Sequence, residues 1–285
     1  MQALYVLLPL LAALSLSKAD EVESEDAVFD ATGVPQCIQA CLSDLLYAVT
    51  EMIHLQNPVA KFPGLCETYR KASSCIENQK EACVQTTLFE IALSGLDELC
   101  NDRDEDLAPH KECLDRHADL ILKNCDHSCH LTSVLSHLAE HGDAEALQKL
   151  EEDHETLKKE LSSICTTFGC MSSCVAHDLN VQCSPVGTII TESLLRPFHT
   201  AATIFEEIGP RAKISIYRQI PPQCYYLTNL KDVQGIAEGR QPPKPSDLKP
   251  EDAILKEIRL REQQRKQKKA ELEHLFLMDA KQGKQ

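Results

Sequence analysis

Apolar residues recur at three- and four-residue steps along most of this chain, a spacing typical of one face of an α-helix. Pro35 suits the first turn of a helix, so a first helix is expected to begin there and to end by Asn57-Pro58. The apolar series over Val84–Leu99 predicts a second helix, and the series over Leu114–Leu138 predicts a long or broken one. The pattern therefore predicts an all-α protein.

The stretch Leu147–Phe168 has alternating three- and four-residue apolar steps, as in a coiled-coil seam. His141-Gly142-Asp143 lies just before it and is expected to form a turn and a helix N-cap. Three heptads are marginal for a coiled coil. An amphipathic helix packed on its own domain is therefore the preferred interpretation.

The carboxyl-terminal third changes character. Ile216–Tyr226 is apolar, contains Pro221-Pro222, and is expected to be extended. Residues 227–250 are expected to form a Pro-rich linker, and residues 251–285 a charged tail. For this tail an exposed helix, a partner-binding arm and a disordered segment all stay open. The basic run Arg265–Lys269 is expected to be a solvated face, with acidic glycans or anionic lipid as alternative contacts.

Twelve of the fourteen cysteines form two frames of six, each beginning Cys-x3-Cys and, after a gap of variable length, continuing with Cys-x8-Cys. Residues inside the frames also match, since Thr68-Tyr69 lies over Thr167-Phe168. We therefore predict that a duplicated helical domain spans residues 35–226, with repeat one at about 35–112 and repeat two at about 113–226. The first frame is Cys37, Cys41, Cys66, Cys75, Cys83 and Cys100; the second is Cys125, Cys129, Cys165, Cys174, Cys183 and Cys224; Cys113 and Cys170 lie outside both.

The amino-terminal residues predict the compartment. Leu4–Leu16 is almost wholly apolar but too short to span a bilayer, and it leads to a small-residue cleavage site before Asp20. We interpret residues 1–19 as a signal peptide and residues 20–34 as an acidic leader, and we predict a soluble, secreted, extracellular protein without a transmembrane segment. In that compartment fourteen cysteines, an even number, predict seven disulfides.

Helix geometry limits how these cysteines pair. Residues four apart on a helix have Cβ atoms about 5 to 6 Å apart, whereas a disulfide requires roughly 3.5 to 4.5 Å. Each Cys-x3-Cys is therefore expected to bond to another segment, as in a stapled helical hairpin. If each frame closes its own three bonds, parity pairs Cys113 with Cys170.

Composition narrows the possible functions. The formal net charge is -15, which disfavours nucleic acid as a partner. Aromatic residues make up only 5% of the chain and Trp is absent, so cross-links are expected to supply a substantial part of the stability.

One motif suggests catalysis. Cys174-Val-Ala-His177-Asp178 partly resembles the Cys-x2-His-Asp helix of secreted phospholipases A2, where the His is a base and the Asp holds calcium. Here Ser173 replaces the preceding cysteine, and the chain lacks a glycine-rich calcium loop. A base without an oxyanion stabiliser or a metal contributes little, so we predict no enzymatic activity and no catalytic residue.

Several other groups have metal-ligand chemistry, but each has a simpler interpretation. We predict that Cys125 and Cys129 form disulfides, that the His137 and His141 pair lies on a solvated helix face, and that the alternating aspartates lie in a polar loop. We therefore predict no metal and no cofactor. In the loop, Leu107 replaces the turn glycine of a calcium-binding EF loop. The candidate ligands are Cys125, His127, Cys129 and His130, the i, i+4 pair His137 and His141, and the alternating Asp102, Asp104 and Asp106.

The cysteine framework and several short phrases resemble the chondroitin proteoglycan 4 domain of nematode secreted proteins. The resemblance covers about Cys37 to Phe198 and implies a helical extracellular module, associated with extracellular matrix and without catalysis. The residues that carry it are Cys37-Ile-Gln-Ala-Cys41, Cys66, Tyr69, Cys75, Leu93-Ser94-Gly95-Leu96, Cys100, Cys113, Cys125-Asp-His-Ser-Cys129, Cys174, Cys183 and Glu192-Ser-Leu-Leu-Arg-Pro-Phe198.

Chondroitin attachment is one trait of that family which the sequence argues against. Chondroitin chains attach at Ser-Gly, and the single Ser-Gly here, Ser94-Gly95, lies inside an apolar helical pattern. We expect no glycan there, and the chain has no Asn-x-Ser/Thr sequon. The expected function is a structural or binding role in extracellular matrix, with a matrix protein or glycan as a possible partner. The alternatives are a carrier of small hydrophobic ligands and, less favoured, a calcium-dependent lipase using His177 and Asp178.

Overall fold

A computed structural model describes residues 36–53, 58–79, 86–141, 154–248, 254–256, 258–260 and 262–268. Over these residues the protein is helical and contains no strand, which confirms the all-α prediction. None of the described helices combines the length and hydrophobicity needed to cross a membrane. The predicted signal peptide, the acidic leader and the turn at Gly142-Asp143 lie outside the described residues.

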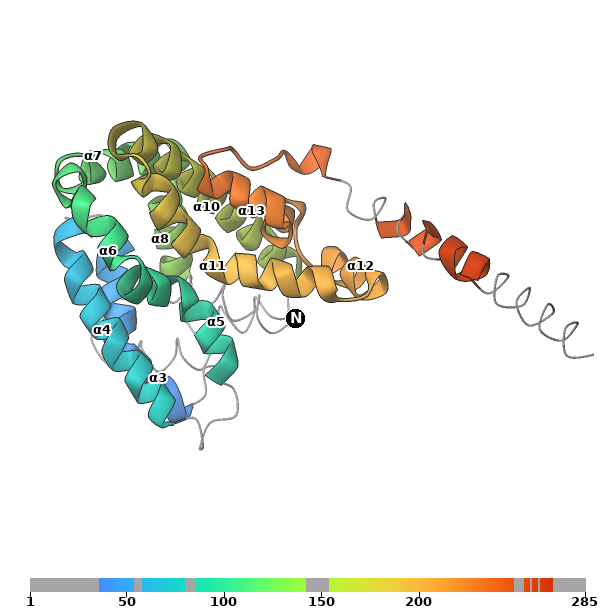
Figure 1. The fold of residues 1–285 in the computed structure, drawn as a ribbon, viewed down its shortest axis with the longest axis horizontal. Coiled ribbons are helices and arrows are strands. Elements are labelled where there is room, and N and C mark those ends of the chain that lie inside the picture. Colours follow the sequence, from blue (N-terminus) through green and yellow to red (C-terminus); the bar gives the residue numbers. More distant parts are fainter. Residues whose placement is uncertain are drawn as a thin grey trace, which may run out of the picture.

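The first half of the protein is built on an antiparallel helix pair (Figure 1). Helix α3 (Gln36–Ile53) places Ile38, Leu42 and Leu45 on one face, at the three- and four-residue spacing seen in the sequence. These residues form one buried cluster with side chains of α4 (Pro58–Asn78). The chain continues through α5 (Thr86–Asp97), the π-helical turn η1 (Glu98–Asp102), α6 (Asp104–Leu107) and the 3-10 turn η2 (Ala108–His110).

The second half surrounds a single long helix, α10 (His154–Cys183). This helix packs against α7, α8, α11, α13 and η3 (Figure 1). The long or broken helix predicted over Leu114–Leu138 is broken at His130, which adopts left-handed backbone angles with φ 61°. The other elements are α7 (Lys111–Cys129), α8 (Leu131–His141), α11 (Val186–Glu207), α12 (Pro210–Gln219), η3 (Pro222–Thr228), α13 (Leu230–Ala237) and η4 (Pro245–Asp247).

Three disulfides join α7 to α10, and the three other described disulfides join α3 to α4, α4 to η1 and α10 to η3. No described disulfide joins residues on opposite sides of residue 112. Cys37 is also disulfide-bonded, whereas Cys83 lies outside the described residues. The α7–α10 bonds are Cys113–Cys183, Cys125–Cys174 and Cys129–Cys170, and the others are Cys41–Cys75, Cys66–Cys100 and Cys165–Cys224.

The prediction that each Cys-x3-Cys bonds to another segment is confirmed for Cys41, Cys125 and Cys129. The predicted Cys113–Cys170 pair is wrong. Cys170 faces Cys129 at the far end of α7, about 24 Å along the helix from Cys113 at 1.5 Å per residue. The predicted pair came from counting the cysteines left over outside the two frames. Such a count carries no information on how far apart two cysteines lie along a helix.

The two cysteine frames are paired differently. The third and sixth cysteines are bonded in both frames, as Cys66–Cys100 and Cys165–Cys224. The fourth cysteine bonds to the second in the first frame and to the first in the second frame. Cys129 and Cys183 of the second frame bond to Cys170 and Cys113, which lie outside both frames. The assumption that each frame closes its own three bonds is therefore wrong for the second frame.

Two expectations for the carboxyl-terminal third are corrected by the structure. The segment Ile216–Tyr226 is not extended, because α12 continues to Gln219 and η3 begins at Pro222. The predicted linker 227–250 is not a free spacer, since α13 lies within it and packs on α10 and α11. Its Val233, Ile236 and Ala237 are buried in the core, as an amphipathic helix dictates.

We predict that Cys165–Cys224 stabilises the protein more than Cys129–Cys170 does. With Cys125–Cys174 intact, Cys129–Cys170 closes only a short ring in the unfolded chain, whereas Cys165–Cys224 spans 59 residues. Loop entropy then predicts that the double change Cys165→Ala/Cys224→Ala lowers the free energy of unfolding by roughly 1 to 2 kcal/mol more than Cys129→Ala/Cys170→Ala. Denaturant unfolding of both variants measures this difference, and an equal or reversed order would contradict the pairing.

Candidate functional site

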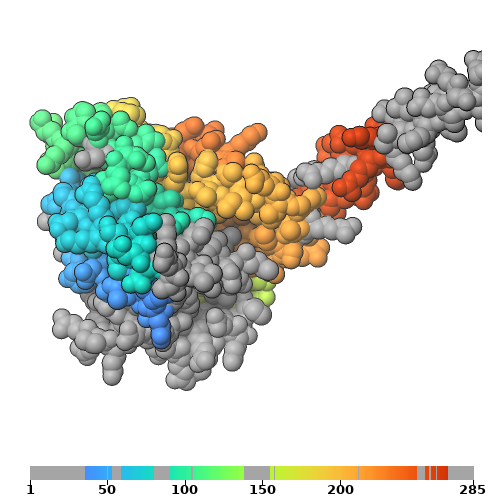
Figure 2. All heavy atoms as spheres, turned by 60° about the horizontal axis from the view of Figure 1, so that its bottom comes forward, coloured from blue at the N-terminus to red at the C-terminus, as the bar shows by residue number. Residues whose placement is uncertain are grey.

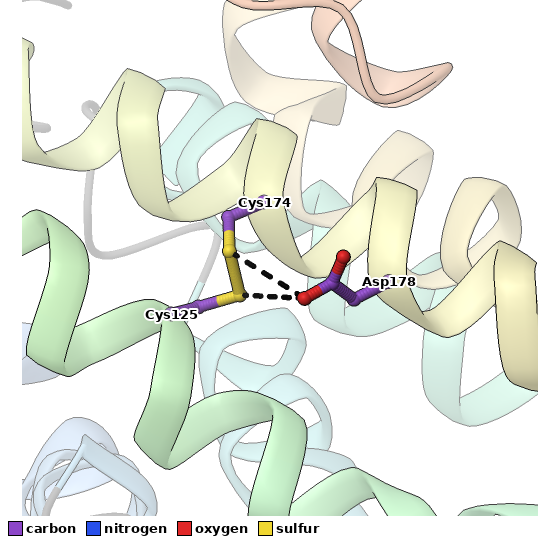
Figure 3. A group of neighbouring side chains, drawn as sticks. All are labelled: Cys125, Cys174 and Asp178. Atoms are coloured by element: carbon purple, nitrogen blue, oxygen red, sulfur yellow. Dashed lines mark hydrogen bonds between the residues drawn. A yellow bond between two sulfur atoms is a disulfide. The ribbon is translucent and has the colours of Figure 1, made fainter.

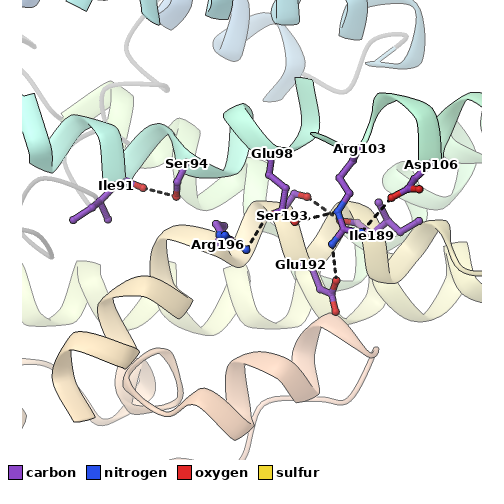
Figure 4. Close-up of polar contacts among 9 residues, drawn as sticks. All are labelled: Ile91, Ser94, Glu98, Arg103, Asp106, Ile189, Glu192, Ser193 and Arg196. Atoms are coloured by element: carbon purple, nitrogen blue, oxygen red, sulfur yellow. Dashed lines mark hydrogen bonds and ion pairs between the residues drawn. The ribbon is translucent and has the colours of Figure 1, made fainter. Parts of the chain in front are cut away.

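The single Ser-Gly of the sequence lies where α5 approaches α11 most closely (Figure 4). A β-carbon at Gly95 would overlap the main-chain carbonyl oxygen of Ser193, and Pro197 lies next to the same point. Only glycine allows two helix backbones to come this close. Gly95 is therefore a packing residue that joins the two halves of the protein.

The Ser94 side chain is hydrogen-bonded within α5, the same helix that contains Gly95. Its hydroxyl donates to the carbonyl oxygen of Ile91 at 2.7 Å, and the side chain is half-buried (Figure 4). On the facing helix, the buried Ser193 hydroxyl donates in the same way to Ile189, at 3.1 Å. Both hydroxyls thus satisfy their hydrogen bonds within helices that are packed at this junction.

An ionic cluster continues this junction toward η1 (Figure 4). The Glu98 side chain is only 10% exposed, and its two carboxylate oxygens lie 3.1 Å from Arg103 Nε and 3.5 Å from Arg196 Nη1. Arg103 also contacts Asp106 at 3.2 Å and Glu192 at 3.6 Å. Hydrogen bonds to Glu98 and Asp106 raise the pKa of Arg103 above its usual value. The cluster pairs its charges internally, which is the arrangement of a structural site.

Sequence patterns alone do not predict this ionic cluster. Its only sequence signal is Glu98, a charged residue directly before the apolar residues Leu99 and Cys100. The partner Arg196 is almost a hundred residues away, so the pairing depends on the packing of α11 against α5 and η1.

Two further polar contacts fix the end of α5 and the turn η1 to α4. Tyr69 on α4 donates to Asp97 at 2.8 Å, and burial together with this hydrogen bond raises the pKa of Tyr69 to about 12. Arg70 donates to the carbonyl oxygen of Cys100 at 2.5 Å, beside the Cys66–Cys100 disulfide. These contacts hold the start of the ionic cluster in place.

Cys125, Cys174 and Asp178 have ligand atoms close enough together for a metal ion (Figure 3). Both sulfurs, however, belong to one disulfide, and the Asp178 carboxylate lies 3.9 and 4.0 Å from them. A disulfide sulfur is not a thiolate and does not replace one as a metal ligand. In the described part of the chain no other three His, Cys, Asp or Glu residues come within metal-binding distance.

The lipase candidates do not form a paired site in this geometry. His177 and Asp178 are consecutive on α10, so their side chains leave the helix about 100° apart. Asp178 faces the Cys125–Cys174 disulfide (Figure 3). His177 is exposed.

The other candidate ligands are separated or otherwise engaged. His127 and His130 lie with ring centroids 6.4 Å apart at the end of α7, and His137 is exposed on α8. His141 ends α8, and its side chain lies outside the described residues. Of the alternating aspartates, Asp106 is held by Arg103.

We predict that Gly95→Ala lowers the free energy of unfolding by about 1 to 3 kcal/mol, because α5 must move away from the Ser193 carbonyl. Gly64→Ala is the matched control, since a β-carbon there meets no atom within 4 Å and the exposed helical site favours alanine. Gly64→Ala is expected to be neutral or to stabilise by up to about 1 kcal/mol. Equal thermal stabilities of the two variants would refute the close approach.

A double-mutant cycle tests the ionic cluster. Arg103→Met leaves the buried Glu98 carboxylate with Arg196 alone and is expected to cost about 1 to 3 kcal/mol of unfolding free energy. Adding Glu98→Gln removes the poorly compensated charge, so the double variant is expected to be less destabilised than the sum of the single changes. Additive losses in chemical denaturation would show that the two side chains are uncoupled.

Comparison with known proteins assigns the family. A family model described as chondroitin proteoglycan 4 matches residues 26–241, which include all fourteen cysteines. Proteins named chondroitin proteoglycan 4 from Caenorhabditis briggsae and Caenorhabditis elegans are each 22% identical to this chain. The alignments cover 72% of this chain but only 37% and 32% of these relatives, so the chain spans about a third of their length. No solved structure matches the chain. The family match, extending across both cysteine frames, shows that this chain belongs to the chondroitin proteoglycan 4 family.

Proposed function

We propose that this protein is a secreted, non-enzymatic structural or binding component of the extracellular matrix. The observation that carries the proposal is its cross-linking, since all thirteen described cysteines are disulfide-bonded. Disulfides of this density persist in oxidising compartments and are rare in the cytosol. The family name, a proteoglycan, is consistent with that location.

We further propose that Ser94-Gly95 carries no glycan in the folded protein. Ser94 donates its hydroxyl within α5, and Gly95 contacts the Ser193 backbone. Attachment of a chondroitin chain would require this part of α5 to leave α11. In this proposal the cysteine-rich module serves as a rigid structural or binding unit and does not carry a chondroitin chain at Ser94.

The alternative of a hydrophobic-ligand carrier has less support. The two clefts described in the structure are lined mainly by charged and polar side chains. The buried apolar side chains pack against one another in clusters within the helix pairs and their junctions. A lipase role has less support still, because His177 and Asp178 point in different directions.

Intact mass of the protein expressed through a secretory pathway tests the proposal. We expect a mature chain that begins at Asp20 and weighs about 14 Da less than its fully reduced form, as seven disulfides require. Chondroitinase treatment is expected to leave the mass unchanged. Ser94→Ala should differ from the parent protein only by the lost hydroxyl oxygen. A heterogeneous mass that collapses on digestion in the parent, but not in Ser94→Ala, would overturn the claim about Ser94.

A further inference from the structure

The described part of the tail is anchored to the body at one end and then leaves it. We call this part the arm; it comprises residues 254–256, 258–260 and 262–268, all of them helical. Ile254 is buried in one apolar cluster with Phe205 and Tyr217, and Ile258 packs against that cluster. Beyond this anchor the arm projects away from the body (Figure 2). Most of its surface therefore faces solvent.

The exposed surface of the arm includes apolar side chains. Leu255 is 43% exposed and Leu260 is 55% exposed. Leu260 follows the anchoring Ile258 by two residues, so its side chain leaves the helix on the opposite side. Residues 262–268 are exposed throughout, and a short helix that buries none of its faces is only marginally stable in water. The arm thus has the properties of a helix that is stabilised by a partner surface.

The arm is also basic, in a chain whose formal net charge is -15. Its described residues include five Lys or Arg and one Glu. A partner surface for the arm should therefore combine apolar and acidic side chains. The charged residues of the arm are Lys256, Arg259, Glu262, Arg265, Lys266 and Lys268.

A surface of that kind lies at the carboxyl-terminal end of α11. Ile204 is 50% exposed there. The half-buried Ala201 and Ile208 lie three residues before it and four residues after it, and so on the same face of the helix. Glu206 and Glu207 are exposed beside them. These five residues are here called the α11 patch.

The two carboxylates of the α11 patch are available to a partner. Among the residues that the structure describes, no cation forms an ion pair with Glu206 or Glu207. Lys213, on the next helix, lies over the Phe205 ring, 5.8 Å from its centroid. The patch therefore offers negative charge that its own chain leaves unpaired.

The arm and the α11 patch lie at the same end of the protein. Ile208 of the patch belongs to the apolar cluster that anchors Ile254 of the arm. Within one chain, however, the arm leaves the patch exposed. When two complementary surfaces lie together on one subunit, two copies related by a two-fold axis make every contact twice. A second copy of this chain therefore fits both surfaces at once.

We propose that two copies of this chain form a two-fold dimer in which each arm covers the α11 patch of the other copy. The leucines of the arm pack against Ile204 of the other copy and remove apolar surface from water. The basic residues of the arm face Glu206 and Glu207 of the other copy and provide specificity. An unrelated acidic partner is less favoured, because this chain itself supplies both complementary surfaces.

Sedimentation equilibrium of the full secreted chain tests this inference. We expect twice the monomer mass, with a dimer that weakens as salt is raised. Leu260→Glu is expected to weaken dimerisation about tenfold or more, because it places a carboxylate in both copies of the contact. Leu120→Glu is the matched control, since Leu120 is 63% exposed on α7, and it should change dimerisation less than about twofold.

Charge reversal tests the pairing of the arm with the α11 patch. The arm variant Arg265→Glu/Lys266→Glu/Lys268→Glu and the patch variant Glu206→Lys/Glu207→Lys are each expected to weaken dimerisation about tenfold or more. An equimolar mixture of the two variants is expected to form a heterodimer, because each arm then meets a patch of opposite charge. The control Lys71→Glu/Lys111→Glu/Lys123→Glu reverses three exposed charges on α4 and α7, and should change dimerisation less than about twofold.

Three results would overturn the proposal. The first is a parent protein that remains monomeric at about 100 μM, where a dimer with a Kd tenfold lower is mostly assembled. The second is an equal loss of dimer in the arm variant and its α4–α7 control. The third is the absence of a heterodimer in the mixture, since an arm that binds only its own chain gives that result. Circular dichroism of each variant shows that the fold is retained.

Discussion

The three disulfides between α7 and α10 are the constraint on which the rest of the structure depends. Cys125–Cys174 and Cys129–Cys170 form two adjacent staples because both helices carry cysteines four residues apart and run antiparallel. Cys113–Cys183 closes the opposite end of the same pair. These bonds fix the carboxyl-terminal half of α10. Helices α11 and α13 pack on α10, and Cys165–Cys224 joins η3 to it. This explains how a chain with few aromatic residues holds a defined core.

The two halves of the protein are joined by packing instead of by a described disulfide. The junction depends on Gly95, which lets α5 reach the backbone of α11, and on the ionic cluster around Glu98. A Ser-Gly pair that suggests glycan attachment in sequence is therefore accounted for by helix packing.

Features with a local cause were the ones that the sequence predicted well. The three- and four-residue spacing predicted the helices because it depends on local helix geometry, and the core position of Gly95 followed from the same pattern. The disulfide between Cys113 and Cys183 was missed because it depends on how two helices are aligned. The segment Ile216–Tyr226 was predicted to be extended, but only Ile220 and Pro221 separate α12 from η3.

Disulfide mapping of the non-reduced protein tests the central claim most directly. Cleavage before Asp126 separates Cys125 from Cys129, and cyanogen bromide cleavage after Met171 separates Cys170 from Cys174. The structure predicts linked peptides that contain Cys113 with Cys183, Cys125 with Cys174, and Cys129 with Cys170. A peptide linking Cys113 to Cys170, or Cys125 to Cys170, would contradict the alignment of α7 with α10 and the arrangement built on it.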